Sequence, residues 1–392
     1  MKIIHTADWH IGKIIHEYSM IKEQEYALKQ FINIIKEEKP HAVIIAGDIY
    51  DRSVAPAEAV ELLDTVLGQI ILELETPVII VAGNHDSPER LSFGSGILRS
   101  KNLFIEGLFK KDIAKAVIYD DYGAVNFYLL PYTDPAIVRN TFQDSGIRTY
   151  DQAMEAIIRY INGSLNKNER NIMVTHGYVR GTNELSISDS ERPLSIGGAD
   201  YVDINHFKDF HYTALGHLHR PQKAGSEKAL YSGSLLKYSF SEVNHDKSVT
   251  IINMDSKGDI DIKLKSLVPR KDMRDLEGSL KDLLNPTVYK EIETEHFYRI
   301  LLTDKGEILD PMGRLKSVYP NVMQIMIKER MKDIGEVRTA AAKGYREKSK
   351  LELFSEFYKS LTDGELEPEN KEIMSKTIEE VEKRGDDFHE AY

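Results

Sequence analysis

The chain of 392 residues contains no cysteine. It therefore has no disulfide bonds, thiolate metal ligands or cysteine nucleophile, and a bound metal must use nitrogen and oxygen donors. It also lacks the ~18 uninterrupted apolar residues that a membrane helix needs. Its start, MKIIHTADWH, has neither the basic segment nor the long apolar segment of a signal peptide. We therefore expect a cytoplasmic protein that does not contact a membrane.

An excess of basic charge is missing as well, since the net charge is -12 at pH 7. A protein that holds DNA alone needs a basic surface to neutralise phosphates. Residues 361–392 carry eleven acidic and four basic residues, a net -7 that leaves only -5 of the -12 for residues 1–360. Because the acidity is largely a property of the tail, and because a partner subunit could share the binding of DNA, the charge does not exclude a nuclease.

Short apolar runs alternate with longer amphipathic stretches in the first half of the chain, as in βαβ units. We predict strands at Lys2–Ala7, Ala42–Ala46 and Pro77–Ala82 and helices at Ile21–Glu38 and Ala57–Glu73. Further predicted strands are Val125–Leu130, Asn171–Thr175, Tyr212–Leu215, Ala229–Tyr231, Val249–Asn253 and Ile260–Lys263. The pattern indicates an α/β fold of two sheets packed face to face, with helices outside.

The composition changes twice towards the C-terminus. We predict a main domain over residues 1–268 and a small α/β capping domain over 269–334, which we expect to bind DNA. Residues 335–392 are predicted to form a basic linker and amphipathic helices that bind a partner. In the capping domain, Ser279–Leu284 and Pro311–Val318 are predicted to be helical, and Tyr298–Thr303 and Val322–Ile327 to be strands.

Five short polar motifs follow predicted strands. They are Asp8-Trp9-His10, Gly47-Asp48 with Asp51-Arg52, Gly83-Asn84-His85-Asp86, His176-Gly177 and Gly216-His217-Leu218-His219. Ligands collect at the carboxyl ends of strands in open α/β sheets, so we expect the five motifs to converge. One such motif is common by chance, but five in order predict a metal site.

The motifs hold enough donors for two metal ions. Asp8 and His10 point to one face of an extended segment, so both can bind the same ion. His217 and His219 share this spacing, but they can serve different ions if the turn after Gly216 is not a regular strand. The seven candidate ligands are Asp8, His10, Asp48, Asn84, His176, His217 and His219. If Asp48 bridges, each ion has four protein donors, and such mixed donors suit Mn²⁺, Fe²⁺ or Zn²⁺ better than Mg²⁺ or Ca²⁺.

The ordered motifs resemble those of the calcineurin-like metallophosphoesterase superfamily. The stretches HTADWHIGK, GDIYDR, GNHD, VTHG, GHLHRPQ and YSGSLLKYSFSE resemble the SbcD-type nuclease subunits within it, over residues 1–254. The resemblance implies a two-sheet metallophosphoesterase sandwich flanked by helices, with a capping domain and a helical tail. It implies two divalent ions, with Mn²⁺ as the metal, one held by Asp8, His10, Asp48 and His219 and the other by Asp48, Asn84, His176 and His217.

The resemblance also implies a substrate and partners. The substrate would be DNA, cut as a 3'-5' exonuclease at duplex ends and as an endonuclease at hairpins or single strands. The partner would be an SbcC-like coiled-coil ATPase, with two copies of this chain meeting through helices of the first domain in a heterotetramer.

Chemistry at such a site needs a group that faces the substrate. His85 follows the candidate ligand Asn84, so we expect it to stabilise the transition state or to protonate the leaving 3' oxygen. A histidine in this role needs an orienting carboxylate. The resemblance suggests Asp51, and Asp86 is the competing candidate.

Two basic residues are candidates for phosphate binding. Arg52 is the first, although an exposed arginine is as often a solvated charge. Lys237 is the second, in the segment Tyr231–Ser241, whose aromatic residues could stack on bases or pack against the fold.

Two other functions compete with a DNA nuclease. A protein phosphatase or a cyclic-nucleotide phosphodiesterase of the same superfamily would carry the same motifs, but would not need the C-terminal 120 residues or so. A scaffold without catalysis would have lost ligands, whereas Asn84, His85 and the pair His217 and His219 are all present.

Overall fold

A computed structural model of the chain describes residues 1–191, 201–306, 308–328, 350–362, 364–367, 370–375 and 377. The chain divides into two compact units, one of residues 1–301 and 308–325 and the other of residues 302–307 and 326–392. The predicted basic linker lies outside the described residues apart from Lys350.

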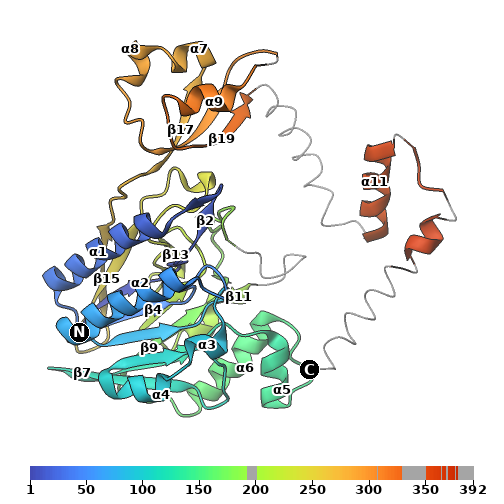
Figure 1. Cartoon of the computed structure of the whole chain (residues 1–392). Coiled ribbons are helices and arrows are strands. Elements are labelled where there is room, and N and C mark those ends of the chain that lie inside the picture. The colour runs from blue at the N-terminus through green and yellow to red at the C-terminus, as the bar shows by residue number, and fades with distance from the viewer. Residues whose placement is uncertain are drawn as a thin grey trace. The chain divides into compact units, whose positions relative to one another are not determined.

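Two six-stranded sheets form the centre of the first unit (Figure 1). Across the first sheet the order is β16 (Ile260–Ser266), β15 (Ser248–Met254), β1 (Lys2–Thr6), β4 (Ala42–Ala46), β5 (Val78–Val81) and β6 (Leu103–Glu106). Across the second it is β13 (Gln222–Ser226), β14 (Ala229–Tyr231), β12 (Tyr212–Gly216), β9 (Arg170–His176), β8 (Gly123–Leu130) and β7 (Ala114–Asp120).

The central strands of both sheets are parallel. β1, β4, β5 and β6 run in one direction in the first sheet, as do β8, β9, β12 and β14 in the second. Antiparallel strands flank them, since β15 pairs with β1, β7 with β8 and β13 with β14. The carboxyl ends of the parallel strands of each sheet therefore lie along one edge.

Apolar side chains hold the two sheets together. Ile44 and Val81 of the first sheet belong to the same buried cluster as Phe127, Val174 and Ala214 of the second. Because these strands are buried on both faces, they consist of continuous apolar runs.

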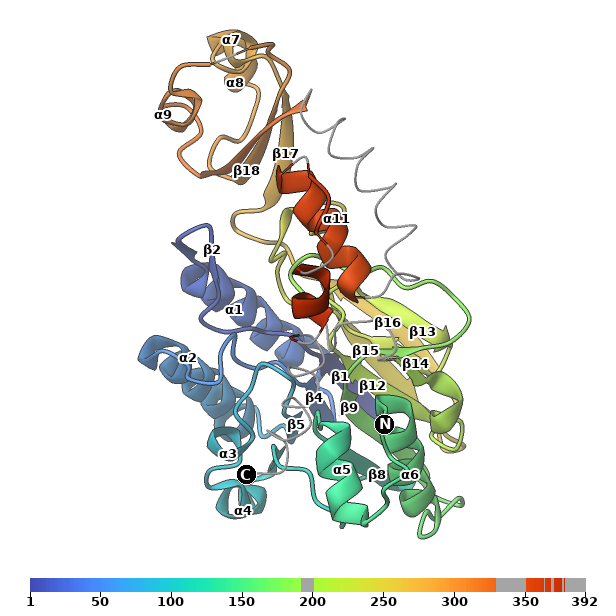
Figure 2. The ribbon, with the colours of Figure 1, turned by 90° about the vertical axis from the view of Figure 1, so that its right-hand side faces the viewer.

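Helices cover the outer faces (Figure 2). On the first sheet lie α1 (Ile21–Glu38) and α2 (Ala57–Gly68), which continues as a π-helix, Gln69–Glu73. On the second lie α5 (Pro135–Phe142) and α6 (Tyr150–Asn162). The short elements are β2 (Ile14–Ile15), β3 (Tyr18–Ser19), α3 (Pro88–Leu91), α4 (Ser95–Leu98), η2 (Arg99–Lys101), β10 (Val179–Arg180), β11 (Val202–Asp203), η3 (Ile204–Phe207) and η4 (Phe240–Glu242).

A smaller three-stranded sheet follows in the order β17-β18-β19. It consists of β17 (Met273–Gly278), β18 (Phe297–Leu302) and β19 (Val322–Ile327), with helices α7 (Leu280–Leu283), α8 (Pro286–Tyr289) and α9 (Pro311–Lys316). The sequence did not predict β17 or α8. In the second unit, α11 spans Lys350–Thr362.

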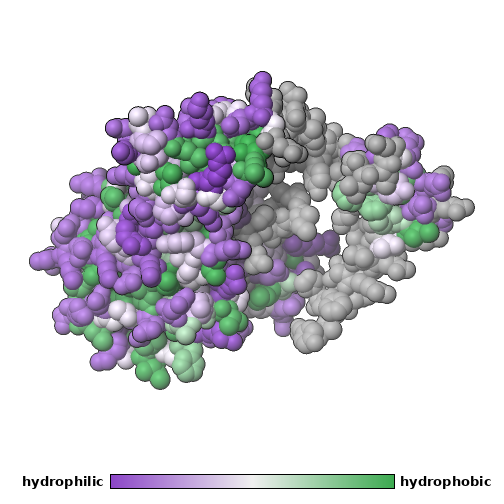
Figure 3. All heavy atoms as spheres, turned by 45° about the horizontal axis from the view of Figure 1, so that its top comes forward, coloured by the Kyte–Doolittle hydropathy of each residue, from purple (hydrophilic) through white to green (hydrophobic). Residues whose placement is uncertain are grey.

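The α/β fold class is confirmed, with both sheets and their helical layers present. The face shown in Figure 3 carries mainly hydrophilic side chains between scattered hydrophobic ones, because most large apolar side chains pack between the layers. Over the ranges that the structure describes, none of the helices has the length and apolarity to span a bilayer.

Candidate metal centre

All five motifs lie at the carboxyl ends of central strands. Asp8 follows β1, Asp48 follows β4, Asn84 follows β5, His176 ends β9, and His217 follows β12. These strands come from both sheets, so the motifs face each other across the edge of the sandwich.

The backbone at the motifs is strained. Asp8, His10, Asp48 and His217 adopt φ angles of 54°, 45°, 50° and 116°, which non-glycine residues rarely adopt. Each such residue costs about 1–3 kcal/mol and is retained where the surroundings enforce it. All four strained residues are candidate ligands. The strain therefore indicates that the backbone at these positions places the ligand side chains at a cost in stability.

Buried carboxylates and close packing enforce these turns. Asp86 accepts hydrogen bonds from the N–H groups of Ile49, Tyr50 and Gly83 at 3.1, 3.0 and 2.9 Å, and so fixes the loop that carries Asp48. Burial and the charge of Asp48 raise the pKa of Asp86 to about 7. At Gly216 a Cβ atom would lie 1.8 Å from the Ala46 carbonyl oxygen, so only glycine permits this approach of the two sheets.

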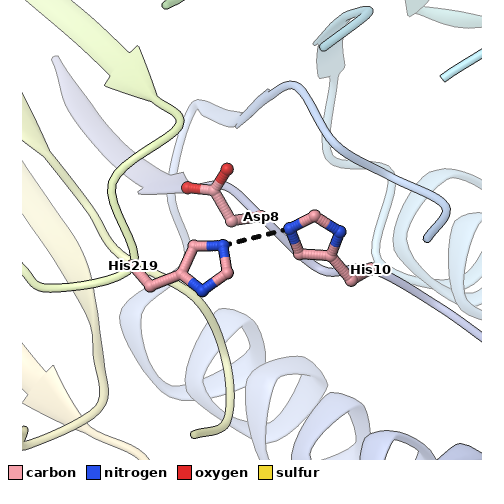
Figure 4. A group of neighbouring side chains, drawn as sticks. All are labelled: Asp8, His10 and His219. Atoms are coloured by element: carbon pink, nitrogen blue, oxygen red, sulfur yellow. Dashed lines mark hydrogen bonds between the residues drawn. The ribbon is translucent and has the colours of Figure 1, made fainter. Parts of the chain in front are cut away.

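The first cluster of donors contains Asp8, His10 and His219, all buried, with their ligand atoms within 4.8 Å of one another (Figure 4). The Nε2 atoms of the two histidines are 3.1 Å apart. Two donors about 2.1 Å from a common ion are typically about 3.0–3.4 Å apart, so this pair has the spacing of two ligands of one ion.

The second cluster centres on Asn84. Its Oδ1 atom lies 3.0 Å from His176 Nε2 and 3.2 Å from His217 Nδ1. His176 is oriented by its other ring nitrogen, which lies 2.9 Å from the Ala46 carbonyl oxygen. A carbonyl oxygen only accepts, so Nδ1 of His176 is the donor in this contact, and Nε2, on the side of Asn84, is the atom that a metal ion would bind.

Asp48 lies between the two clusters. Its Oδ2 atom is 3.6 Å from His10 Nε2 in the first cluster and 3.6 Å from His176 Nε2 in the second. Its Oδ1 atom accepts the N–H of His85 at 2.9 Å. One carboxylate oxygen thus lies equally close to both groups of donors, the position of a bridging ligand.

The protonation states fit divalent cations. Burial lowers the pKa of His10, His176 and His217, and neighbouring histidines lower it further, although Asp48 and the Ala46 carbonyl oppose this at His176. A lowered pKa favours the neutral ring, the form that binds metal. Burial and the Asp48 carboxylate raise the pKa of Asp8 well above its ordinary value. A cation would relieve this repulsion, and the nitrogen and oxygen donors suit a transition metal.

His85 belongs to neither cluster. Its Nε2 atom lies 4.0 Å from Asp48 Oδ2, and its ring stands edge to face against His10, with centroids 4.7 Å apart. Its Nδ1 atom lies 2.9 Å from the main-chain carbonyl oxygen of Asp51. Nδ1 is therefore the donor, and Nε2 faces the candidate metal centre.

The expected orienting carboxylate is thus replaced by a main-chain oxygen. The Asp51 carboxylate binds Lys13 Nζ at 2.6 Å instead, and Asp86 is used in fixing the loop around Asp48. In the structure the contact to His85 Nδ1 comes from the main-chain oxygen of Asp51, and the role of Asp51 in orienting His85 stays a prediction.

The two basic candidates differ. Arg52 is 70% exposed, with its Nε atom 3.8 Å from Asp51 Oδ2, so it stays a prediction for phosphate binding. Lys237 is only 12% exposed, lies 3.0 Å from Asp272 Oδ1 and donates to the Val243 carbonyl oxygen at 2.7 Å. The contact of Lys237 with DNA stays a prediction, and in the structure its ammonium group is paired within the chain.

Two further side chains contact the candidate histidine ligands, and the sequence assigned neither of them to the site. Tyr238 is buried and stands edge to face against both His10 and His219, with centroids 5.6 and 5.8 Å away. Gln24 of α1 donates to the His10 carbonyl oxygen at 2.7 Å. Gln24 belongs to no motif, and no local spacing could have identified it. Tyr238 lies in the segment Tyr231–Ser241, whose aromatic residues the sequence left open between stacking on bases and packing, and in the structure it packs against the fold.

The fold and its donors are those of a known class. A family profile described as calcineurin-like phosphoesterase matches residues 1–221, more than half of the chain. A second profile, described as Type 5 capsule protein repressor C-terminal domain, matches residues 269–362. The fold and the candidate site thus define a metal-dependent phosphoesterase.

The comparison with curated proteins is more specific. The SbcD subunit of the nuclease SbcCD from Staphylococcus epidermidis is 33% identical over 368 residues, which cover 93% of this chain and 95% of the relative. The chain belongs to the SbcD family of nuclease subunits within the calcineurin-like phosphoesterases.

Solved structures with similarity to the chain include two phosphoesterases. A dimetal phosphatase from Danio rerio is 13% identical, and the match covers 68% of this chain and 96% of that one, with a TM-score of 0.40. The phosphoesterase Yfce from E. coli is 12% identical, with coverage of 68% and 100% and a TM-score of 0.27.

Proposed function

We propose that the chain is the nuclease subunit of an SbcCD-like complex and that it hydrolyses phosphodiester bonds of DNA. It acts as a 3'-5' exonuclease at duplex ends and as an endonuclease at hairpins or single strands. The observation that carries the proposal is the position of Asp48, whose Oδ2 atom lies 3.6 Å from a histidine of each donor cluster. The likeness to the SbcD subunit of the nuclease SbcCD over 93% of the chain supports DNA as the substrate.

The proposed ligand set divides into two sites. Asp8, His10, Asp48 and His219 would hold one ion, and Asp48, Asn84, His176 and His217 the other. When bound, two divalent ions, for which we propose Mn²⁺, supply a nucleophile derived from water and neutralise charge on the phosphate during in-line attack.

The remaining steps fall to groups of the chain itself. His85 presents Nε2 to the site while the Asp51 carbonyl oxygen holds Nδ1–H, so His85 can stabilise the transition state or deliver a proton to the leaving 3' oxygen. Arg52, exposed beside Asp51, binds a phosphate of the substrate. Residues 1–268 form the nuclease domain in this proposal, and residues 269–334 a capping domain that contacts DNA.

The test is hydrolysis by the purified chain with Mn²⁺. We expect linear duplex DNA labelled at one strand end to be shortened, and the reaction to stop when a chelator removes the metal and to resume when Mn²⁺ is restored. Phosphopeptides and cyclic nucleotides serve as competing substrates in the same buffer. Hydrolysis of these compounds with DNA left intact would assign the chain to another phosphoesterase activity.

Residues 335–392 bind the ATPase partner in this proposal, and the complex contains two copies of the chain. We expect the full chain, but not a chain that ends at residue 344, to copurify with an SbcC-like coiled-coil ATPase. Both chains should bind Mn²⁺ equally, because the proposed ligands lie within residues 8–219. A stable complex with the shortened chain would move the binding surface elsewhere.

A further inference from the structure

His219 is held by hydrogen-bonding groups at every polar atom that does not face the metal centre. Its main-chain N–H donates to Glu191 Oε1 at 2.7 Å, and its carbonyl oxygen accepts from Lys247 Nζ at 2.8 Å. Its Nδ1 atom lies 3.3 Å from Glu242 Oε1 and 2.7 Å from Ser190 Oγ. Only Nε2 remains, and it faces His10 (Figure 4).

The hydrogen bonds of Ser190 decide where His219 carries its proton. Its hydroxyl has a single hydrogen, and it donates this hydrogen to Glu242 Oε1, because an ionised carboxylate can only accept. Towards His219, Ser190 is therefore an acceptor, and Nδ1 of His219 is the donor. The lone pair of the ring then lies on Nε2, the atom that points into the proposed ligand cluster.

A buried ammonium group keeps Glu242 ionised. Lys247 Nζ lies 2.5 Å from Glu242 Oε2, and the two side chains are 3% and 0% exposed. Lys247 also donates to the His219 carbonyl oxygen and, at 2.8 Å, to Ser234 Oγ, so all three of its donors are used. Because both side chains are buried, the hydrogen bonds of Lys247 to Glu242, His219 and Ser234 set the geometry of the pair.

The other histidines of the ligand set have no hydrogen bond to a carboxylate among the described residues. Nδ1 of His176 contacts the Ala46 carbonyl oxygen, and Nδ1 of His10 has no hydrogen-bond partner, with Asp51 Oδ1 3.7 Å away. His217 presents Nδ1 itself to Asn84. His219 is thus the member of the set that hydrogen bonds to a carboxylate through its second ring nitrogen, the arrangement that makes an imidazole a stronger metal ligand.

We propose that Glu242, with Lys247 as its counter-ion, is a positioning residue that fixes the Nδ1–H form of His219 and thereby sets the affinity of the metal site formed by Asp8, His10, Asp48 and His219. The proposal rests on the two-site ligand set proposed above. It predicts that the two sites respond differently to changes at Glu242, because no ligand of the Asn84 cluster except the shared Asp48 belongs to the site that contains His219.

The test is calorimetric titration of the metal-free full chain with Mn²⁺. In Glu242→Gln, one of the two sites should weaken about 10- to 100-fold, the usual effect of losing a group behind a metal ligand, and the other should keep its affinity. The double variant Glu242→Gln with Lys247→Met removes the unpaired buried ammonium and should show the same loss at one site. In both, ¹⁵N–¹H spectra should show His219 no longer confined to the Nδ1–H form.

Asp120→Asn is the matched control. Asp120 is a buried carboxylate that binds Arg170 and the N-terminal amine rather than a proposed ligand, with side-chain exposures of 3% for Asp120 and 5% for Arg170. It should lower thermal stability and leave both Mn²⁺ affinities unchanged. If Glu242→Gln behaves like this control, or weakens both sites alike, Glu242 has a structural role only and the proposal fails. If the wild-type chain binds fewer than two Mn²⁺ ions, the ligand set of the proposed function is wrong, and this proposal falls with it.

Discussion

Asp48→Asn should reduce DNA hydrolysis by about 10³-fold, since a metal ion contributes several kcal/mol to transition-state stabilisation and each 1.36 kcal/mol is a factor of ten. The variant should also retain fewer than two Mn²⁺ ions after dialysis. Asparagine keeps an oxygen that can accept the His85 N–H now bound by Oδ1, so the loop should keep its shape. What is lost is the negative charge between the two histidines that lie 3.6 Å from Oδ2.

Mass spectrometry measures the loss of Mn²⁺, and cleavage of labelled duplex DNA measures the loss of hydrolysis in the same preparation. Asp261→Asn is the matched control, because Asp261 is 65% exposed and pairs only weakly with Lys263, at 3.8 Å. It should leave metal content and activity unchanged. If Asp48→Asn binds two ions with wild-type affinity, Asp48 does not bridge, and the arrangement of two sites around it is wrong.

His85→Ala should lower the rate of cutting by about 10²- to 10⁴-fold, the range for loss of a general acid or base. Metal content should stay at the wild-type level, because His85 lies outside both proposed ligand sites, with Nε2 4.0 Å from Asp48. The measurement is the single-turnover cleavage rate with saturating Mn²⁺, together with the metal content of the same preparation.

His206→Ala provides the control, since His206 is a partly exposed histidine that pairs with Asp151. Two results would count against the proposed role of His85. If His85→Ala cuts DNA at the wild-type rate, His85 takes no part in the mechanism. Loss of a metal ion would make it a ligand, a role that the geometry permits because His10, Asp51 and His85 also bring donor atoms within 4.8 Å of one another.

The boundaries of the elements show where sequence patterns were sufficient. Ala42–Ala46 and Ile21–Glu38 were predicted as they are found, because a strand buried on both faces and a long amphipathic helix each have an unambiguous apolar pattern. The predicted helix Ala57–Glu73 changes to a π-helix at Gln69, which periodicity does not reveal. Strand β17, Met273–Gly278, was missed because three of its six residues are charged and exposed, which leaves no apolar run.

The sequence by itself determined which residues are available for metal binding, since the candidate ligands follow strands and the ends of parallel strands must meet at one edge. Only the tertiary structure decided which groups form hydrogen bonds or ion pairs with the predicted site residues. Glu242 reaches His219 across 23 residues of chain, the Asp51 carbonyl reaches His85 across 34, and Lys237 is paired with Asp272 across 35. Such partners are chosen by the packing of separate segments, which leaves no periodic or local trace in the sequence.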